Sequence, residues 1–185
     1  MTSGNVAAIW RFPVKSMGGE RLQQAEITEI GIVGDRAFAL LDTDKGKVVS
    51  AKDVRHFPDV LNCKAEFVEP PRAGTQLPPL RISLPNGRSL TSDQNDIDEI
   101  LSAHFGRNVV LTQSAPDDFT VDQYLPDVAG ADAAGRRDIV VAQKLGAALF
   151  AHIGMQSPVP AGSFFDGFPL SILTTSTLAR LAVFP

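Results

Sequence analysis

Residues 80–90 read Leu-Arg-Ile-Ser-Leu-Pro-Asn-Gly-Arg-Ser-Leu, and this stretch decides the fold class. Apolar and polar residues alternate on both sides of Pro85-Asn86-Gly87, which is the strongest hairpin signal in the chain. Alternation with a period of two is typical of a strand that buries one face. The segment therefore predicts two antiparallel strands joined by a tight turn.

Short strands and tight turns make up most of the first ninety residues. A second hairpin is predicted around 42–46, between strand-like runs at 37–41 and 47–50. Further strands are expected at 6–10, 22–30, 63–68 and 108–111. This succession predicts an α+β protein that is mainly β, with a small antiparallel sheet curled toward a barrel in its N-terminal part.

Helical periodicity is found in three places. Apolar residues recur at helical spacing over about 97–105, where Asp93 or Asp96 is a candidate N-cap and Gly106 ends the helix. Residues 139–151 also read as a helix. A last helix begins at Thr174 or Thr175, both of them residue types that favour the N-cap.

The region between the strands and the later helices has no clear period. Residues 115–138 are acidic and rich in Gly and Ala, which predicts a crossover with Asp117, Asp118 and Asp122 in solvent. We therefore expect a β domain at 1–115 and a second unit at 116–185. In that second unit, 158–162 reads as a loop and 170–173 as a short strand.

Composition and charge exclude several classes of protein. The net charge of −4 argues against non-specific nucleic-acid binding, which depends on clustered Lys and Arg. The longest apolar-leaning stretch, 139–153, is too interrupted to span a bilayer. One cysteine, Cys63, rules out an intrachain disulfide and favours a buried apolar role for that residue. We expect a cytoplasmic protein with no nucleic-acid partner.

Three short segments carry basic residues at the ends of predicted strands. They are Lys15-Ser16 after Pro13, Arg36 after Asp35 in a Gly-rich turn, and Lys52 after the 47–50 strand, with Arg55 and His56 nearby. If Lys15, Arg36 and Lys52 converge, they form a pocket for a small anion. The alternatives are an exposed Lys-Ser turn and a surface Asp-Arg ion pair. The three histidines show no metal-ligand spacing.

The order and spacing of these segments resemble those of the MOSC family, which binds the molybdenum cofactor. The resemblance covers essentially the whole chain and is carried by Phe12-Pro13-Val14-Lys15-Ser16, Gly34-Asp35-Arg36, Ser50-Ala51-Lys52, Pro58, Glu66, Pro70-Pro71-Arg72, Phe164-Phe165-Asp166 and the run 173–178. It implies an N-terminal β domain at 1–115, then a crossover and the first elements of a MOSC barrel at 116–185.

The resemblance also implies a cofactor and its contacts. Lys15, Ser16 and Arg36 are expected to bind the pterin-phosphate part of the molybdenum cofactor (molybdopterin). Lys52, Gly167 and Phe168 are candidates for a further part of that pocket. No metal ligand is predicted, because the family's metal-binding cysteine belongs to a later region and Cys63 does not replace it.

The activity that the resemblance implies is that of an oxidoreductase similar to the amidoxime-reducing proteins, or of a carrier of activated sulfur. A complete protein of this kind would need a small N-hydroxylated substrate and an electron donor. The alternative is a non-catalytic module that binds an anion or the pterin phosphate, or an inactive shortened chain. Sulfur transfer coupled to a pyridoxal-phosphate partner is weaker, because the sequence has no lysine motif for that cofactor.

The last residues read as the beginning of an element whose partner surface is missing. Leu178, Leu181, Val183 and Phe184 are apolar and close to the final residue of the sequence. We therefore expect a shortened protein, with self-association through this surface. We also expect little or no molybdenum in the chain by itself.

Overall fold

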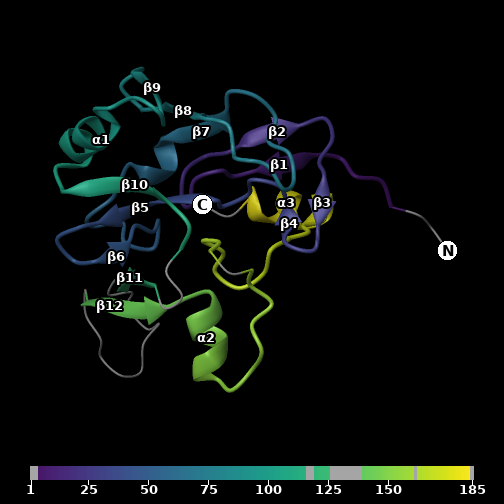
Figure 1. Ribbon diagram of the computed structural model, residues 1–185. Helices are drawn as coiled ribbons and strands as arrows, with labels where there is room; N and C mark the ends of the chain where they lie inside the picture. The colour runs from purple at the N-terminus through teal and green to yellow at the C-terminus, as the bar shows by residue number, and fades with distance from the viewer. Residues whose placement is uncertain (1–3, 116–118, 126–138, 161, 184–185) are drawn as a thin grey trace.

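The computed structural model describes residues 4–115, 119–125, 139–160 and 162–183. Its elements are short and mostly strands (Figure 1). In chain order they are β1 Ile9–Arg11, β2 Glu20–Leu22, β3 Ile27–Thr28, β4 Gly31–Ile32, β5 Phe38–Asp42, β6 Lys47–Val48, a 3-10 turn Val60–Asn62, β7 Lys64–Phe67, β8 Leu80–Ser83, β9 Ser89–Thr91, α1 Ile97–Phe105, β10 Val109–Gln113, β11 Thr120–Leu125, β12 Ile139–Lys144, α2 Ala147–His152 and α3 Thr175–Leu181.

The strands form small antiparallel sheets, so the prediction of a mainly β, α+β fold is confirmed. Two of these sheets have three strands, in the orders β10-β5-β6 and β7-β8-β9. The segment after β1 lies between them, because Val14 forms a parallel bridge with Phe38 and Gly18 forms one with Lys64. None of the sheets of the described residues closes into a barrel.

The predicted hairpins and the first helix form where their turn signals lie. β8 pairs with β9 across the 85–87 turn, and β5 pairs with β6 across a turn in which Gly46 has φ 64°. Helix α1 ends at Gly106, which adopts φ 63° and donates its N–H to the carbonyl of Ser102. Glycine is favoured there because a side chain destabilises this left-handed conformation.

Two clusters of buried apolar residues fix the arrangement. The larger one packs α1 against the three-stranded sheets and includes Val14, Leu40, Cys63, Ile82 and Leu101. The second joins both halves of the chain and consists of Ala39, Val48, Phe119, Val121, Leu145 and Phe164. Because Phe164 is fully buried against this second cluster, the chain that follows it is held close to β5 and β6. The division at residue 115 stays a prediction.

Two predictions for the second half are wrong. Residues 139–144 are strand β12, paired with β11, and only Ala147–His152 forms a helix. The β-branched Ile139, Val140 and Val141 suit a strand once β11 offers a partner. Asp122 was expected in solvent but is 7% exposed, because β11 places it beside β6. Asp117 and Asp118 lie outside the described residues.

Smaller differences concern the ends of elements. Residues 22–30 contain the end of β2 and all of β3 rather than one strand, and 170–173 does not form a strand. Asp96 occupies the N-cap of α1 but makes no capping hydrogen bond there. Thr174 does cap α3, since its hydroxyl oxygen accepts the N–H of Thr177 at 3.1 Å.

Helix α3 contributes no buried residue within the described part of the chain. The side chains of Leu178 and Leu181 are 50% and 59% exposed. Self-association through this face stays a prediction. Among the described residues, no helix combines the length and the apolar character that crossing a membrane requires.

Candidate functional site

Lys15 is a buried cation at the centre of the candidate site. Its backbone N–H donates to the carbonyl of Phe38 at 2.8 Å, and its neighbour Val14 is fully buried. Its ammonium donates to the carbonyl of Phe164 at 3.1 Å and forms an ion pair with Asp166. Burial lowers the pKa of Lys15, although the charge of Asp166 and their hydrogen bond act in the opposite direction.

Lys52 approaches the same carboxylate from another loop. Its ammonium lies 3.2 Å from one oxygen of Asp166 and donates to the side-chain oxygen of Gln143, also at 3.2 Å. Burial by itself would raise the pKa of Asp166, but the two lysines outweigh it, so the pKa is lowered. The carboxylate of Asp166 is therefore ionised between two cations at neutral pH.

Arg36 is the third cation of the site, and hydrogen bonds of its backbone hold it in place. Its N–H donates to the carbonyl of Phe12 at 2.8 Å, and its carbonyl accepts the N–H of Phe164 at 3.0 Å. Its φ of 48° is uncommon for a residue other than glycine. The guanidinium carbon lies 4.9 Å from the ring centre of Phe12 and 5.7 Å from that of Phe165. These rings flank the charge without neutralising it.

The buried carboxylate of Asp35 orients the guanidinium of Arg36. Its side chain is 6% exposed, accepts the N–H of Phe12 at 2.6 Å and forms an ion pair with the guanidinium of Arg36. Burial raises the pKa of Asp35, while the charge of Arg36 and the hydrogen bond from Phe12 lower it. The predicted alternative of a surface ion pair therefore describes only Arg36, whose side chain is 34% exposed.

Ser16 connects two of the loops that carry these cations. Its φ is 66°, and its hydroxyl oxygen accepts the N–H of Ala51 at 3.0 Å. This contact holds Lys15 and Lys52 near each other, because each is a direct chain neighbour of one partner. The hydroxyl keeps its own proton, which it can donate to an anion.

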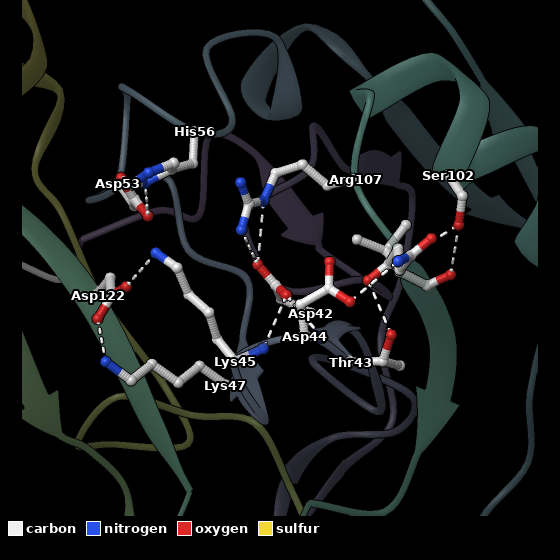
Figure 2. A network of polar contacts seen from close by, with 12 residues as sticks. Asp42, Thr43, Asp44, Lys45, Lys47, Asp53, His56, Ser102, Arg107 and Asp122 are labelled. Atoms are coloured by element: carbon white, nitrogen blue, oxygen red, sulfur yellow. Dashed lines mark hydrogen bonds and ion pairs between the residues drawn. The ribbon is translucent and has the colours of Figure 1, made fainter.

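The loop that carries Lys52 is supported by a network of polar contacts (Figure 2). The Asp53 carboxylate contacts the His56 ring at 2.8 Å, and the carbonyl of Lys52 accepts the N–H of Tyr124 in β11 at 2.8 Å. In the same network, the carboxylate of Asp122 binds Lys45 at 2.8 Å and also binds Lys47. Strand β11 is thus fastened to the β5–β6 hairpin beside the site.

The other candidate residues lie farther along or elsewhere. Gly167 and Phe168 directly follow Asp166, and Phe168 is 66% exposed, with its ring in a T-shaped arrangement with that of Phe150. Cys63 is fully buried in the larger apolar cluster, as predicted, and burial raises its pKa to about 11. Among the described residues, no group of three or more metal-binding side chains is found.

The structure therefore brings Lys15, Arg36 and Lys52 to one segment, 164–166. Sequence reasoning missed Asp166 as a site residue and noted it only within the Phe164-Phe165-Asp166 segment. No local signal marked it, because a lysine needs a counter-charge only when it is buried, and the fold decides that burial. The sequence did not show which acidic residue supplies it.

The three cations themselves lie within a region that matches a family model. The family model described as the MOSC N-terminal beta barrel domain matches residues 3–132. That range contains Lys15, Ser16, Arg36 and Lys52 but not Asp166. No curated protein and no solved structure matches the chain.

Proposed function

Because this chain belongs to the MOSC N-terminal beta barrel domain family, we propose that it binds the molybdenum cofactor at the Lys15 site. Lys15, Ser16 and Arg36 bind the phosphate end of molybdopterin. Lys52, Gly167 and Phe168 are proposed to form a further part of the same binding site. When bound, the cofactor supplies the redox or sulfur-carrying chemistry of its metal centre.

One observation carries this proposal: three cations from three loops surround one carboxylate-bearing segment. Lys15 and Lys52 both pair with Asp166, and the charges of Lys52 and Arg36 both lower the pKa of Lys15. Like charges are kept this close at a cost, which an anionic ligand repays. The residues present thus fit a phosphate group, which carries up to two negative charges near neutral pH.

Each residue has a distinct task in binding this group. Lys15 supplies a charge that its burial keeps in one place. Arg36 supplies a planar fork, braced by Asp35 and the two phenylalanine rings, that matches two phosphate oxygens. Ser16 donates its hydroxyl proton while it accepts the N–H of Ala51.

The activity proposed for a protein with this domain is reduction of N-hydroxylated compounds or transfer of activated sulfur. Either one requires a small substrate, and the first also requires an electron donor. We propose the cytoplasm as its compartment, because the only cysteine in the sequence, Cys63, is a free thiol.

A second candidate is a non-catalytic module that binds the pterin phosphate or another anion. It is favoured by the state of Cys63. A thiol that is fully buried with a pKa of about 11 does not supply the thiolate that a soft metal requires. Under this proposal the chain binds the anionic end of the ligand and contributes no ligand to the metal.

The test is a titration of the purified chain with inorganic phosphate, followed by calorimetry and by amide chemical shifts. We expect binding that is lost in Lys15→Met and weakened by about tenfold in Arg36→Gln, equivalent to one charge-assisted hydrogen-bonded pair. Arg88→Ala removes an exposed arginine in the β8–β9 turn and serves as the matched control. Binding that is equal in all four proteins contradicts the proposal.

The cofactor itself provides the second readout. The chain and the Arg36→Gln variant are incubated with molybdopterin, and the pterin retained after gel filtration is measured by fluorescence. Retention by the native chain and its reduction in Arg36→Gln support the proposal. Equal retention by both would mean that Arg36 does not contact the cofactor.

A further inference from the structure

The ion pair between Lys15 and Asp166 is unequal in its burial. The Lys15 side chain is 7% exposed, whereas that of Asp166 is 47% exposed. An unpaired buried charge costs several kcal/mol, so the charged form of Lys15 strongly favours an anion beside it. Asp166 has no such requirement, because water can solvate its carboxylate when the lysine is satisfied in another way.

The carboxylate of Asp166 occupies the place that an anionic ligand needs. It is bound by Lys15 and Lys52 together, and those are two of the cations assigned above to phosphate binding. A phosphate and a carboxylate cannot both take the same ammonium hydrogen atoms. Ligand binding therefore requires that Asp166 leave at least one of the two lysines.

The backbone around Asp166 permits this exchange without moving the segment. The carbonyl of Asp166 accepts the N–H of Gly146 at 3.1 Å, and the N–H of Phe164 donates to the carbonyl of Arg36 at 3.0 Å. Phe164 and Phe165 are buried. The Asp166 side chain is 47% exposed, so its carboxylate can turn toward solvent. In this exchange, rotation of the side chain releases the lysines while the backbone stays in place.

We propose that Asp166 is an internal counter-anion that competes with the ligand and sets the charge the site accepts. This inference rests on the proposed function, because it concerns the same site. An incoming group replaces a carboxylate shared by two lysines, so a dianion is favoured over a monoanion. In the absence of ligand the site is closed by Asp166, and Lys15 stays neutralised.

The effect on affinity follows from competition. An internal group that occupies the site for most of the time weakens ligand binding. The apparent dissociation constant is the intrinsic one divided by the fraction of molecules in which the site is free. Removing its charge should restore the intrinsic affinity. We expect Asp166→Asn, which keeps the size of the side chain and the backbone contact with Gly146, to bind inorganic phosphate at least about fivefold more tightly than the native chain.

Four further variants and a second anion make this measurement specific. Asp122→Asn removes the other carboxylate that lies between two lysines, and it should leave the phosphate affinity unchanged. Asp166→Ser removes the charge through a smaller side chain and should reproduce the gain if Asp166→Asn folds poorly. In the double variant Lys15→Met with Asp166→Asn, the gain should disappear. Nitrate, a monoanion, should bind the native chain more weakly than phosphate does, and Asp166→Glu, which retains the charge, should keep this preference.

The outcomes separate this inference from the function on which it rests. Tighter phosphate binding in Asp166→Asn, lost when Lys15 is also replaced, supports both. Phosphate binding that depends on Lys15 but is unchanged or weakened by Asp166→Asn overturns the role of Asp166 and leaves the proposed function intact. Absence of Lys15-dependent binding in the native chain and in Asp166→Asn overturns both.

Discussion

Two aspartates of this chain each lie between two lysines, and they differ in which charge is buried. The Asp122 side chain is 8% exposed, while those of Lys45 and Lys47 are 32% and 28% exposed (Figure 2). At Asp166 the order is reversed, since the carboxylate is 47% exposed and Lys15 only 7%. The first arrangement buries an anion beneath partly exposed cations, and the second buries a cation beneath a half-exposed anion.

In each pair, the exposed charge is the one that another ion can replace. A buried charge that loses its partner stays desolvated, whereas an exposed one returns to water at little cost. Asp122 therefore depends on its lysines, and this contact fastens β11 to the β5–β6 hairpin. Lys15 depends on an anion but not on a particular one, which suits a binding site.

The largest effect is expected when both cations around Asp122 are removed. Lys45→Met combined with Lys47→Met leaves a buried carboxylate without a counter-charge, which should cost about 3–5 kcal/mol of unfolding free energy. Urea denaturation followed by circular dichroism measures it. Lys64→Met is the matched control, because its pair with Glu66 is exposed and should be worth about 0.5 kcal/mol. A loss below about 1 kcal/mol in the double variant would mean that water reaches Asp122.

An intermediate effect is expected from removing the buried anion. Asp122→Asn loses two charge-assisted hydrogen bonds but leaves lysines that water can solvate, so about 2 kcal/mol should be lost at neutral pH. Asp166→Asn should lose more, about 3 kcal/mol, because it leaves the buried ammonium of Lys15 without its anion. The same denaturation experiment compares them. Equal losses would remove the difference between the two regions.

The pH dependence of stability tests the charge of the buried Asp122. Burial acts to raise the pKa of Asp122, but hydrogen bonds and charges from Lys45 and Lys47 lower it overall. A carboxylate with a lowered pKa in the folded state stabilises the protein above its unfolded pKa of about 4, and this stabilisation is lost as the pH falls through the folded value. The unfolding free energy of the native chain should therefore decrease below about pH 5, and less steeply in Asp122→Asn.

The smallest effect on stability is expected at the proposed binding site. Lys15→Met replaces a buried cation by an apolar side chain of similar length and returns Asp166 to water. The free energy of unfolding should change by about 1 kcal/mol or less, or increase. Thermal and urea unfolding check this beside the phosphate titration. A loss above about 3 kcal/mol would show that Lys15 is needed for folding. The loss of phosphate binding in Lys15→Met would then be explained by the loss of the fold and would contradict a separate role in binding.

Local sequence signals predicted much of the N-terminal half. The 85–87 and 42–46 turns produce hairpins because their residues favour the required backbone angles, whatever surrounds them. Helix α1 forms for a similar reason, with apolar residues at helical spacing and Gly106 at its end. The basic residues at strand ends were also evident, since strand ends are where a chain leaves the core.

The features that the sequence did not reveal all depend on distant partners. Residues 139–144 have a composition that suits a strand or a helix, and pairing with β11 decides for a strand. Asp122 is charged, so it was expected in solvent. In the structure it is neutralised by two lysines that lie 75 and 77 residues away in the sequence. No local pattern encodes either contact.

By itself, the sequence determined the class of the fold, the positions of the hairpins and the family to which the chain belongs. Only the tertiary structure decided that Asp166, 151 residues from Lys15, is its counter-anion, and that one member of this pair is buried while the other is exposed. The physical reason is that turn and strand preferences act between near neighbours. The burial and pairing of a charge are set by whatever segments the fold packs around it.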